Sequence, residues 1–145
     1  MSRIKIELPS TFPFHTHIPV RITDLNYGGH VGNDTVLSII HEARMQFLRQ
    51  FGFSEMNAGG VGMIMADAAI EFKNELFYGD VVKAAVAAGD LSRVGFELYY
   101  LMEKEQDGKQ VKVAAAKTSM VCYDYAHKRI ASLPPELKKT LLPPV

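Results

Sequence analysis

One stretch with helical periodicity constrains the fold of this chain more than any other feature. After residue 33, apolar residues recur every three or four positions as far as residue 51, which places them along one face of a helix. This stripe consists of Val36, Ile39, Ile40, Ala43, Phe47 and Phe51. Asn33 or Asp34 is expected to cap the start of the helix, and Gly52 stands where a helix commonly ends.

The rest of the chain is predicted to form mostly β-strands. Runs rich in apolar and β-branched residues are separated by short turns, and the segments expected to form strands are residues 12–22, 61–74, 81–90, 93–105 and 110–124. Strands joined by short turns pair antiparallel. We therefore expect an α+β fold, in which one long helix lies against a curved antiparallel sheet of about five strands. A short second helix is expected over residues 134–142.

Composition narrows the class of protein. The 145 residues have a formal net charge of zero, which argues against nucleic acid as a partner because phosphate binding needs a basic surface. No apolar run approaches the roughly 18 residues needed to span a membrane. The single cysteine, Cys122, excludes an internal disulfide bond and fits a reducing compartment. We expect a single domain, residues 1–145, that is cytoplasmic and has no membrane partner.

The segment from Arg21 to Asn33 carries the candidate chemistry. It brings together four polar side chains just before the long helix: Asp24, Asn26, His30 and Asn33. Tyr27, Gly28 and Gly29 lie between them, and the glycines let the backbone approach a ligand closely. A helix that starts after such a turn directs free N–H groups at whatever occupies it. This arrangement suits a reacting carbonyl.

This segment, with the motifs that follow it, resembles the hotdog-fold thioesterases of the 4-hydroxybenzoyl-CoA thioesterase and acyl-CoA thioesterase type. The resemblance covers residues 14–142. Its motifs are Asp24-x-Asn26-x-x-Gly29-His30-Val31-x-Asn33, His41-Glu42-Ala43-Arg44, Ala69-Ile-Glu71-Phe72, Tyr78-Gly79-Asp80, Val121-Cys-Tyr-Asp124 and Leu133-Pro134.

The resemblance implies five-stranded subunits wrapped around a central helix and assembled as homodimers, often homotetramers. It places the site at the subunit interface, where a CoA or acyl-carrier-protein thioester enters. The thioester carbonyl would be polarised by a backbone N–H near the helix start, here that of Asn33. No cofactor or metal is expected. His15 and His17 could share one strand face, but no cysteine or carboxylate cluster accompanies them.

One position departs from the family pattern. Members that hydrolyse through a carboxylate have Asp-x-Asp here, whereas this chain has Asn26 at the second position. A neutral amide cannot take a proton from water or attack a thioester. The base is therefore open between Asp24, His30 and Asp67, an acidic residue within an otherwise apolar strand. Glu42 in the helix could also supply the missing carboxylate if it faces a partner's site. The alternative for Asp24 is a structural role in the turn. The alternative for the side chain of Asn33 is to cap the helix.

Two further turns carry residues that the resemblance connects with CoA phosphates. They are Ser92-Arg93 and Lys128-Arg129. The alternative is that these turns only expose charged side chains to solvent. Ser92 and Arg93 are expected to bind substrate.

Three functions remain open from the sequence. The first is hydrolysis of an acyl thioester to a carboxylic acid and a free thiol. The second is hydration of an enoyl thioester, because hydratases of the same fold carry Asp-x-Asn-Pro-x-His, although this chain lacks the proline and has one extra residue before His30. The third is acyl-thioester binding without catalysis, which Asn26 favours.

Overall fold

A computed structural model of the chain describes residues 2–142, so Met1 and residues 143–145 of the predicted domain lie outside the described residues. A single hydrophobic core runs through this part of the chain. In order, the elements are β1 (Phe14–Pro19), the 3₁₀ turn η1 (Ile22–Asp24), α1 (Asn33–Arg49), β2 (Gly62–Phe72), β3 (Val81–Gly89), β4 (Gly95–Gln106), β5 (Lys109–Asp124), β6 (Arg129–Ile130) and α2 (Pro135–Leu141).

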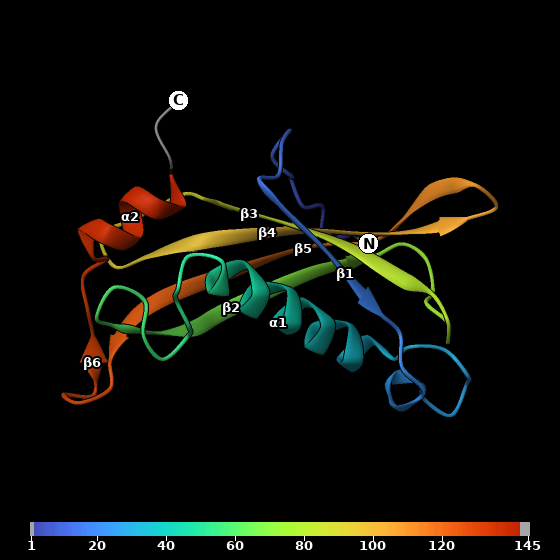
Figure 1. Ribbon diagram of the computed structural model, residues 1–145, viewed down its shortest axis with the longest axis horizontal. Coiled ribbons are helices and arrows are strands. Elements are labelled where there is room, and N and C mark those ends of the chain that lie inside the picture. The colour runs from blue at the N-terminus through green and yellow to red at the C-terminus, as the bar shows by residue number, and fades with distance from the viewer. Residues whose placement is uncertain (1, 143–145) are drawn as a thin grey trace.

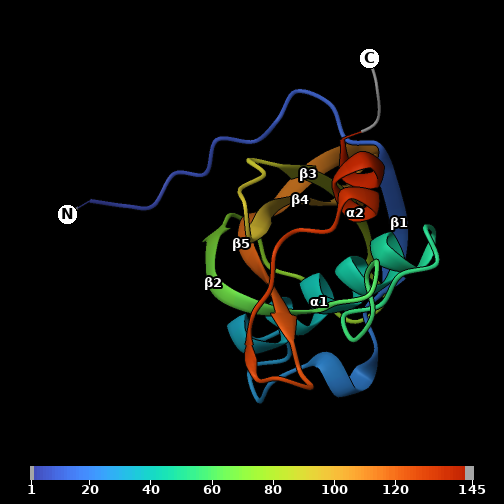
Figure 2. The same cartoon turned by 90° about the vertical axis from the view of Figure 1, so that its left-hand side faces the viewer.

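The strands form one antiparallel sheet in the order β1-β3-β4-β5-β2, with the short β6 paired to β5. The sheet curves around α1, which lies along its concave face (Figures 1 and 2). The predicted α+β hotdog architecture is confirmed. The sheet has six strands rather than about five, because the two residues of β6 are too few to produce a periodic pattern.

The core lies between α1 and the sheet. Along β4 buried residues alternate with partly exposed ones, as expected for a strand with one face against the helix. The predicted stripe of α1 is buried except at its end, where Phe51 is 36% exposed because the helix stops at Arg49. Alanines 84, 114 and 116 belong to the core. Their small side chains leave room for the helix inside the curve of the sheet.

The two ends of α1 are built differently from each other. The residue at the N-cap is Gly32, and its carbonyl accepts hydrogen bonds from the N–H groups of Thr35 (3.0 Å) and Val36 (3.1 Å). The prediction that Asn33 or Asp34 caps the helix is therefore wrong, since both lie inside its first turn and no side-chain cap bond forms there. At the other end Gly52 has φ +78°, the left-handed conformation that glycine adopts without strain.

The first strand is shorter than predicted, and the second contains an irregularity that the sequence did not predict. The first ends at Pro19 because the chain then turns through η1, where the Asp24 carboxylate accepts the Arg21 N–H at 2.8 Å. In β2 a bulge lies between Met65 and Asp67, so that these two residues pair with the consecutive residues Met120 and Ser119.

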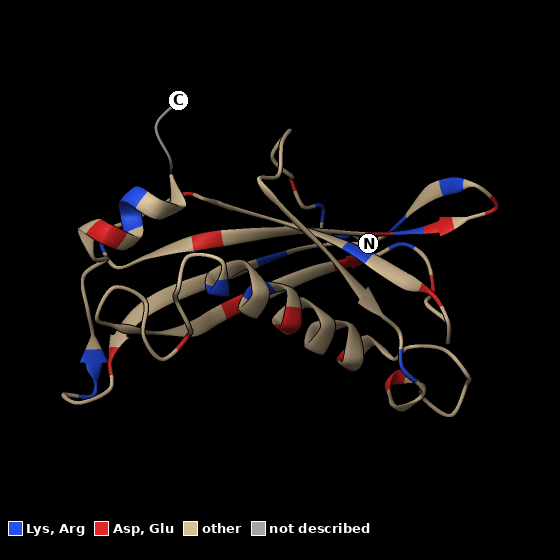
Figure 3. Cartoon of the chain, in the orientation of Figure 1, with Lys and Arg blue, Asp and Glu red and all other residues tan. Residues whose placement is uncertain are grey.

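Charged residues of both signs are spread over both helices, the strands and the turns (Figure 3). Within residues 2–142, neither helix combines the length and the apolar character that a membrane crossing requires.

Candidate active site

The turn before α1 is a tight loop closed by its own backbone. The N–H of Asn26 donates to the carbonyl of His30 (2.9 Å), and the N–H of Gly29 donates to the carbonyl of Asn26 (3.1 Å). The side-chain oxygen of Asn26 accepts the N–H of Gly28 at 2.8 Å. Gly29 has φ +81°, which explains the glycine there. Asn26 therefore holds the loop in shape, while Tyr27 is fully exposed.

The start of α1 offers hydrogen-bond donors. The N–H groups of Thr35 and Val36 are taken up by Gly32, as described above. Those of Asn33 and Asp34 have no acceptor within the described part of the chain. Such groups carry the positive end of the helix dipole and attract an oxygen with developing negative charge. The Asn33 N–H that was predicted to polarise the carbonyl is therefore free to donate, and its role stays a prediction.

A cleft of about 260 Å³ opens beside this helix start. His30 and Asn33 line one wall, and residues 72–76 line the other. The two walls are joined by a hydrogen bond from the Val31 N–H to the Leu76 carbonyl at 2.9 Å. Lys73 and Glu75 also line the cleft. Lys73 and Glu75 could not be predicted from the sequence, because they follow a strand that ends at Phe72 and come beside the turn only in the folded chain.

His30 is held in a defined orientation. Its Nδ1 lies 3.2 Å from the carbonyl oxygen of Val31. Because a carbonyl can only accept, Nδ1 carries the proton in this contact, and Nε2 of the neutral ring is left with a lone pair. Nε2 lies 3.9 Å from a Glu75 carboxylate oxygen, and the imidazole side chain is one-third exposed. The ring is therefore arranged to accept a proton, with a carboxylate nearby to stabilise the resulting cation.

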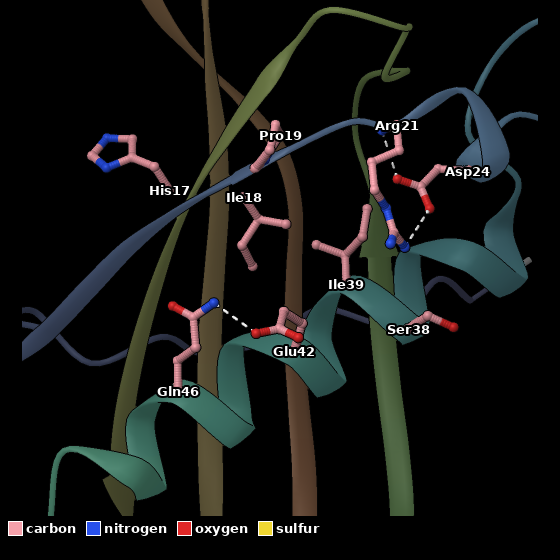
Figure 4. Close-up of a pocket in the computed structure, with 9 residues that line it drawn as sticks. All are labelled: His17, Ile18, Pro19, Arg21, Asp24, Ser38, Ile39, Glu42 and Gln46. Atoms are coloured by element: carbon pink, nitrogen blue, oxygen red, sulfur yellow. Dashed lines mark hydrogen bonds and ion pairs between the residues drawn. The ribbon is translucent and has the colours of Figure 1, made fainter.

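Asp24 faces a different cleft, of about 300 Å³, between β1 and α1 (Figure 4). Its carboxylate is buried, and it accepts the Arg21 N–H at 2.8 Å and the Arg21 Nη2 at 3.3 Å. In the same cleft Glu42 accepts a hydrogen bond from Gln46 at 2.7 Å. The structure therefore separates Asp24 from His30 and Asn33, and gives its carboxylate the turn-forming role that the sequence left open.

Asp67 lies on the opposite face of the sheet from α1. It pairs with Ser119 and forms an ion pair with Lys117 at 3.4 Å. Lys117 and Ser119 alternate along β5 with residues buried against the helix, so all three side chains point away from it. Hydrogen bonding from Ser119 and the charge of Lys117 lower the pKa of Asp67. One chain does not bring Asp67 to the helix start, and its role as a base stays a prediction.

Ser92 and Arg93 lie in the β3–β4 turn, near α2 and at the other end of the molecule from the start of α1 (Figure 1). The Arg93 carbonyl accepts the Leu133 N–H at 2.9 Å, which ties this turn to the segment before α2. A single chain does not place either residue beside the cleft of His30. Their contact with substrate stays a prediction.

Cys122 is buried in the core, and desolvation raises the pKa of its thiol to about 11, which keeps it protonated at neutral pH. Within residues 2–142, no group of three or more His, Cys, Asp or Glu side chains could hold a metal ion.

Comparison with known proteins places the chain in a family. A family model described as the thioesterase-like superfamily matches residues 20–141. The chain belongs to the thioesterase-like superfamily. A superfamily relative in Microcystis aeruginosa, a 1,4-dihydroxy-2-naphthoyl-CoA hydrolase, is 30% identical over 125 residues, which are 84% of this chain and 88% of the relative. A relative in Aquifex aeolicus that carries an esterase name is 30% identical over 131 residues, 89% of this chain and 98% of the relative.

Solved structures of thioesterases confirm the fold. A 1,4-dihydroxy-2-naphthoyl-CoA thioesterase from Synechocystis superimposes with a TM-score of 0.77 at 22% identity, over 88% of this chain and 94% of that one. The resemblance to hotdog thioesterases deduced from the sequence is therefore confirmed. So is the predicted type of reaction: this member of the thioesterase-like superfamily is an enzyme that hydrolyses thioesters.

Proposed function

We propose that the protein hydrolyses acyl-CoA thioesters in the cleft between the start of α1 and residues 72–76. The observation that carries this proposal is that the free N–H of Asn33 and the imidazole of His30 line the same cleft. The first is a donor for the oxyanion and the second is an acid–base group, the two functions that acyl transfer to water requires.

In the proposed reaction the thioester carbonyl oxygen accepts hydrogen bonds from the helix-start N–H groups. His30 Nε2 takes a proton from a water molecule as the water oxygen bonds to the carbonyl carbon. The tetrahedral intermediate then collapses, the carbon–sulfur bond breaks, and the proton passes from His30 to the departing thiolate. Glu75, 3.9 Å from Nε2, stabilises the imidazolium between these two steps. The products are a carboxylic acid and a free thiol.

This mechanism does not use a carboxylate at position 26. Asn26 keeps the loop closed through Gly28, and its neutral amide supports the carbonyl site without taking the proton. Asp24 holds η1 through Arg21.

CoA is favoured over a carrier protein as the source of the thioester because the relative in Microcystis aeruginosa is named as a hydrolase of a CoA thioester.

A homodimer joined along β2 is also part of the proposal. β2 is an edge strand of the sheet, and its Ile64 and Met65 are 38% and 40% exposed, the kind of apolar edge that a second copy covers. The proposal also includes pairing of dimers into tetramers and a cytoplasmic location.

The test is release of free thiol from a panel of short-chain, long-chain and aromatic acyl-CoA thioesters. We expect turnover with at least one of them, and a fall of roughly 100-fold in kcat for His30→Gln. His127→Gln is the matched control, since His127 lies at the turn before β6, where it contacts Asp124. Tight CoA binding without thiol release would show a non-catalytic binder. Consumption of crotonyl-CoA without thiol release would show a hydratase.

A further inference from the structure

A cleft with a basic lining adjoins the cleft of the proposed reaction. Its volume is about 620 Å³, and it is lined by Arg3, Ile4, Lys5, Glu71, Phe72 and Lys73. Phe72 and Lys73 also line the cleft that contains His30 and Asn33. The two clefts therefore meet at the end of β2, and a ligand that extends out of one continues into the other.

The basic cleft exists because the segment before β1 crosses the sheet from one edge strand to the other. β1 and β2 are the two edges, and the N–H of Ile6 donates to the carboxylate of Glu71 on β2 at 2.6 Å. Ile6 and Leu8 are partly buried, whereas Glu7 between them is exposed, so one side of the segment faces the protein. Figure 2 shows the segment passing over the sheet on the side away from α1.

Cations outnumber anions in the lining of this cleft. Arg3, Lys5 and Lys73 face a single carboxylate, Glu71, among the described residues that line it, which leaves a net charge of +2. Arg3 and Lys5 are exposed and form no ion pair within residues 2–142. The chain as a whole has a formal net charge of zero, so this excess of positive charge is local. It suits a ligand that carries several negative charges.

Glu71 holds the segment in place rather than neutralising the cleft. Its Oε1 accepts the Ile6 N–H, and its Oε2 lies 3.6 Å from Nζ of Lys73. The hydrogen bond from Ile6, together with the positive charges of Lys73 and Arg3, lowers the pKa of the Glu71 carboxyl group. Arg3 acts on Glu71 through its charge, which places the guanidinium near this carboxylate without an ion pair between them. Arg3 therefore keeps its donors for a ligand, and a guanidinium binds phosphate oxygens well.

We propose that the basic cleft binds the phosphate groups of the CoA thioester while the thioester carbonyl lies at the start of α1. This inference rests on the proposed function, which supplies the CoA thioester. CoA carries its phosphates at one end and the thioester at the other end of its pantetheine chain, so it fits two adjoining clefts. Phe72 is 42% exposed and lines both clefts, where it contacts the apolar part of pantetheine. Arg3 and Lys5 lie outside the two turns that the family resemblance connects with these phosphates.

The test compares a CoA thioester with the N-acetylcysteamine thioester of the same acyl group, which has no phosphate. In Arg3→Gln/Lys5→Gln, KM for the CoA thioester should rise about tenfold, roughly threefold for each exposed charge pair that is lost. Its kcat should stay within about twofold, because the two residues bind the ground state and the transition state equally. The kcat/KM for the N-acetylcysteamine thioester should also stay within about twofold.

Two further variants separate the loss of charge from damage to the structure. Arg49→Gln/Lys109→Gln removes the same two charges from exposed positions at the end of α1 and the start of β5, and KM for the CoA thioester should stay within about twofold. Glu71→Gln keeps an acceptor for the Ile6 N–H and removes the negative charge, so KM for the CoA thioester should fall about threefold. Damage to the segment would raise this KM instead.

Binding of adenosine 3′,5′-bisphosphate, the phosphorylated nucleoside of CoA, tests the basic cleft without turnover. The unmodified protein should bind it, and Arg3→Gln/Lys5→Gln should weaken the binding about tenfold. Unchanged KM and unchanged binding in this variant, or an equal loss of kcat/KM with both thioesters, would overturn the inference and leave hydrolysis standing. Absence of thiol release from every acyl-CoA, with nucleotide binding that still depends on Arg3 and Lys5, would overturn hydrolysis and leave the phosphate site standing.

Discussion

Replacing Asn33 by proline removes the proposed oxyanion donor and little else. Asn33 is the first residue of α1, where proline is favoured because its fixed φ suits a helix start. Its N–H has no acceptor within the described chain, so the substitution breaks no protein hydrogen bond. Gly32, the preceding residue, has φ −71° and ψ 158°, the extended conformation that a residue before proline adopts. We expect the free energy of unfolding to rise by about 1 kcal/mol at most, because proline at a compatible position restricts the unfolded chain.

The effect on catalysis should be much larger. Removing one oxyanion donor lowers kcat by about 100- to 1000-fold, or roughly 3–4 kcal/mol of transition-state stabilisation. The N–H of Asp34 remains as a second donor, so we expect a loss near 100-fold. Steady-state thiol release measures kcat, and urea unfolding measures stability. Asn33→Ala is the matched control, because it keeps the N–H and removes the side chain, and it should retain kcat within about threefold. If the proline variant is folded and equally active, the helix start does not bind the carbonyl.

Three other substitutions test separate parts of the structure. Asp24→Asn keeps an acceptor for the Arg21 N–H, so kcat should stay within about threefold and the free energy of unfolding should fall by about 1 kcal/mol at most. A loss of activity equal to that of His30→Gln would show that Asp24 is catalytic. Gly95→Ala should destabilise by about 3 kcal/mol or more in urea unfolding, since the added Cβ would lie 2.2 Å from the Met120 carbonyl oxygen; normal stability would refute that close approach. Burial raises the pKa of Cys122 to about 11, so its thiol ionises first in the unfolded chain, and the free energy of unfolding should fall as the pH rises from about 9 to 11. Cys122→Ala should flatten this fall by up to about 1.4 kcal/mol per pH unit, and an identical slope would contradict the shift.

The sequence predicted much of the architecture because local patterns record which face of an element is buried. The stripe of α1 and the patterns along the strands predicted both helices and five of the six strands within a few residues, and only the two-residue β6 was missed among the strands. The turn from Arg21 to Asn33 was also correctly placed before the helix. Chemistry that depends on one local segment, such as the free N–H groups at the start of α1, could be predicted in the same way.

Residues that lie far apart in the chain could not be assigned from local patterns. Asp67 was a candidate base because it interrupts an apolar run, but the bulge in β2 turns it to the face away from α1. A shift of one residue reverses the face of every following side chain, and periodicity alone does not reveal where such a shift occurs. Ser92 and Arg93 are candidates from the family resemblance, and a single chain places their turn near α2, so their contact with substrate stays a prediction.

The sequence by itself determined the class of fold, the polar turn and the loss of a carboxylate at Asn26, because each of these depends on residues close together in the chain. Only the tertiary structure decided which side chains share a cleft. It turned Asp24 toward Arg21, set His30 beside Glu75, and brought Arg3 and Lys5 to the cleft that Lys73 lines. The physical reason is that the curvature and register of the sheet, which depend on packing along the whole chain, fix the distance between segments that are remote in sequence.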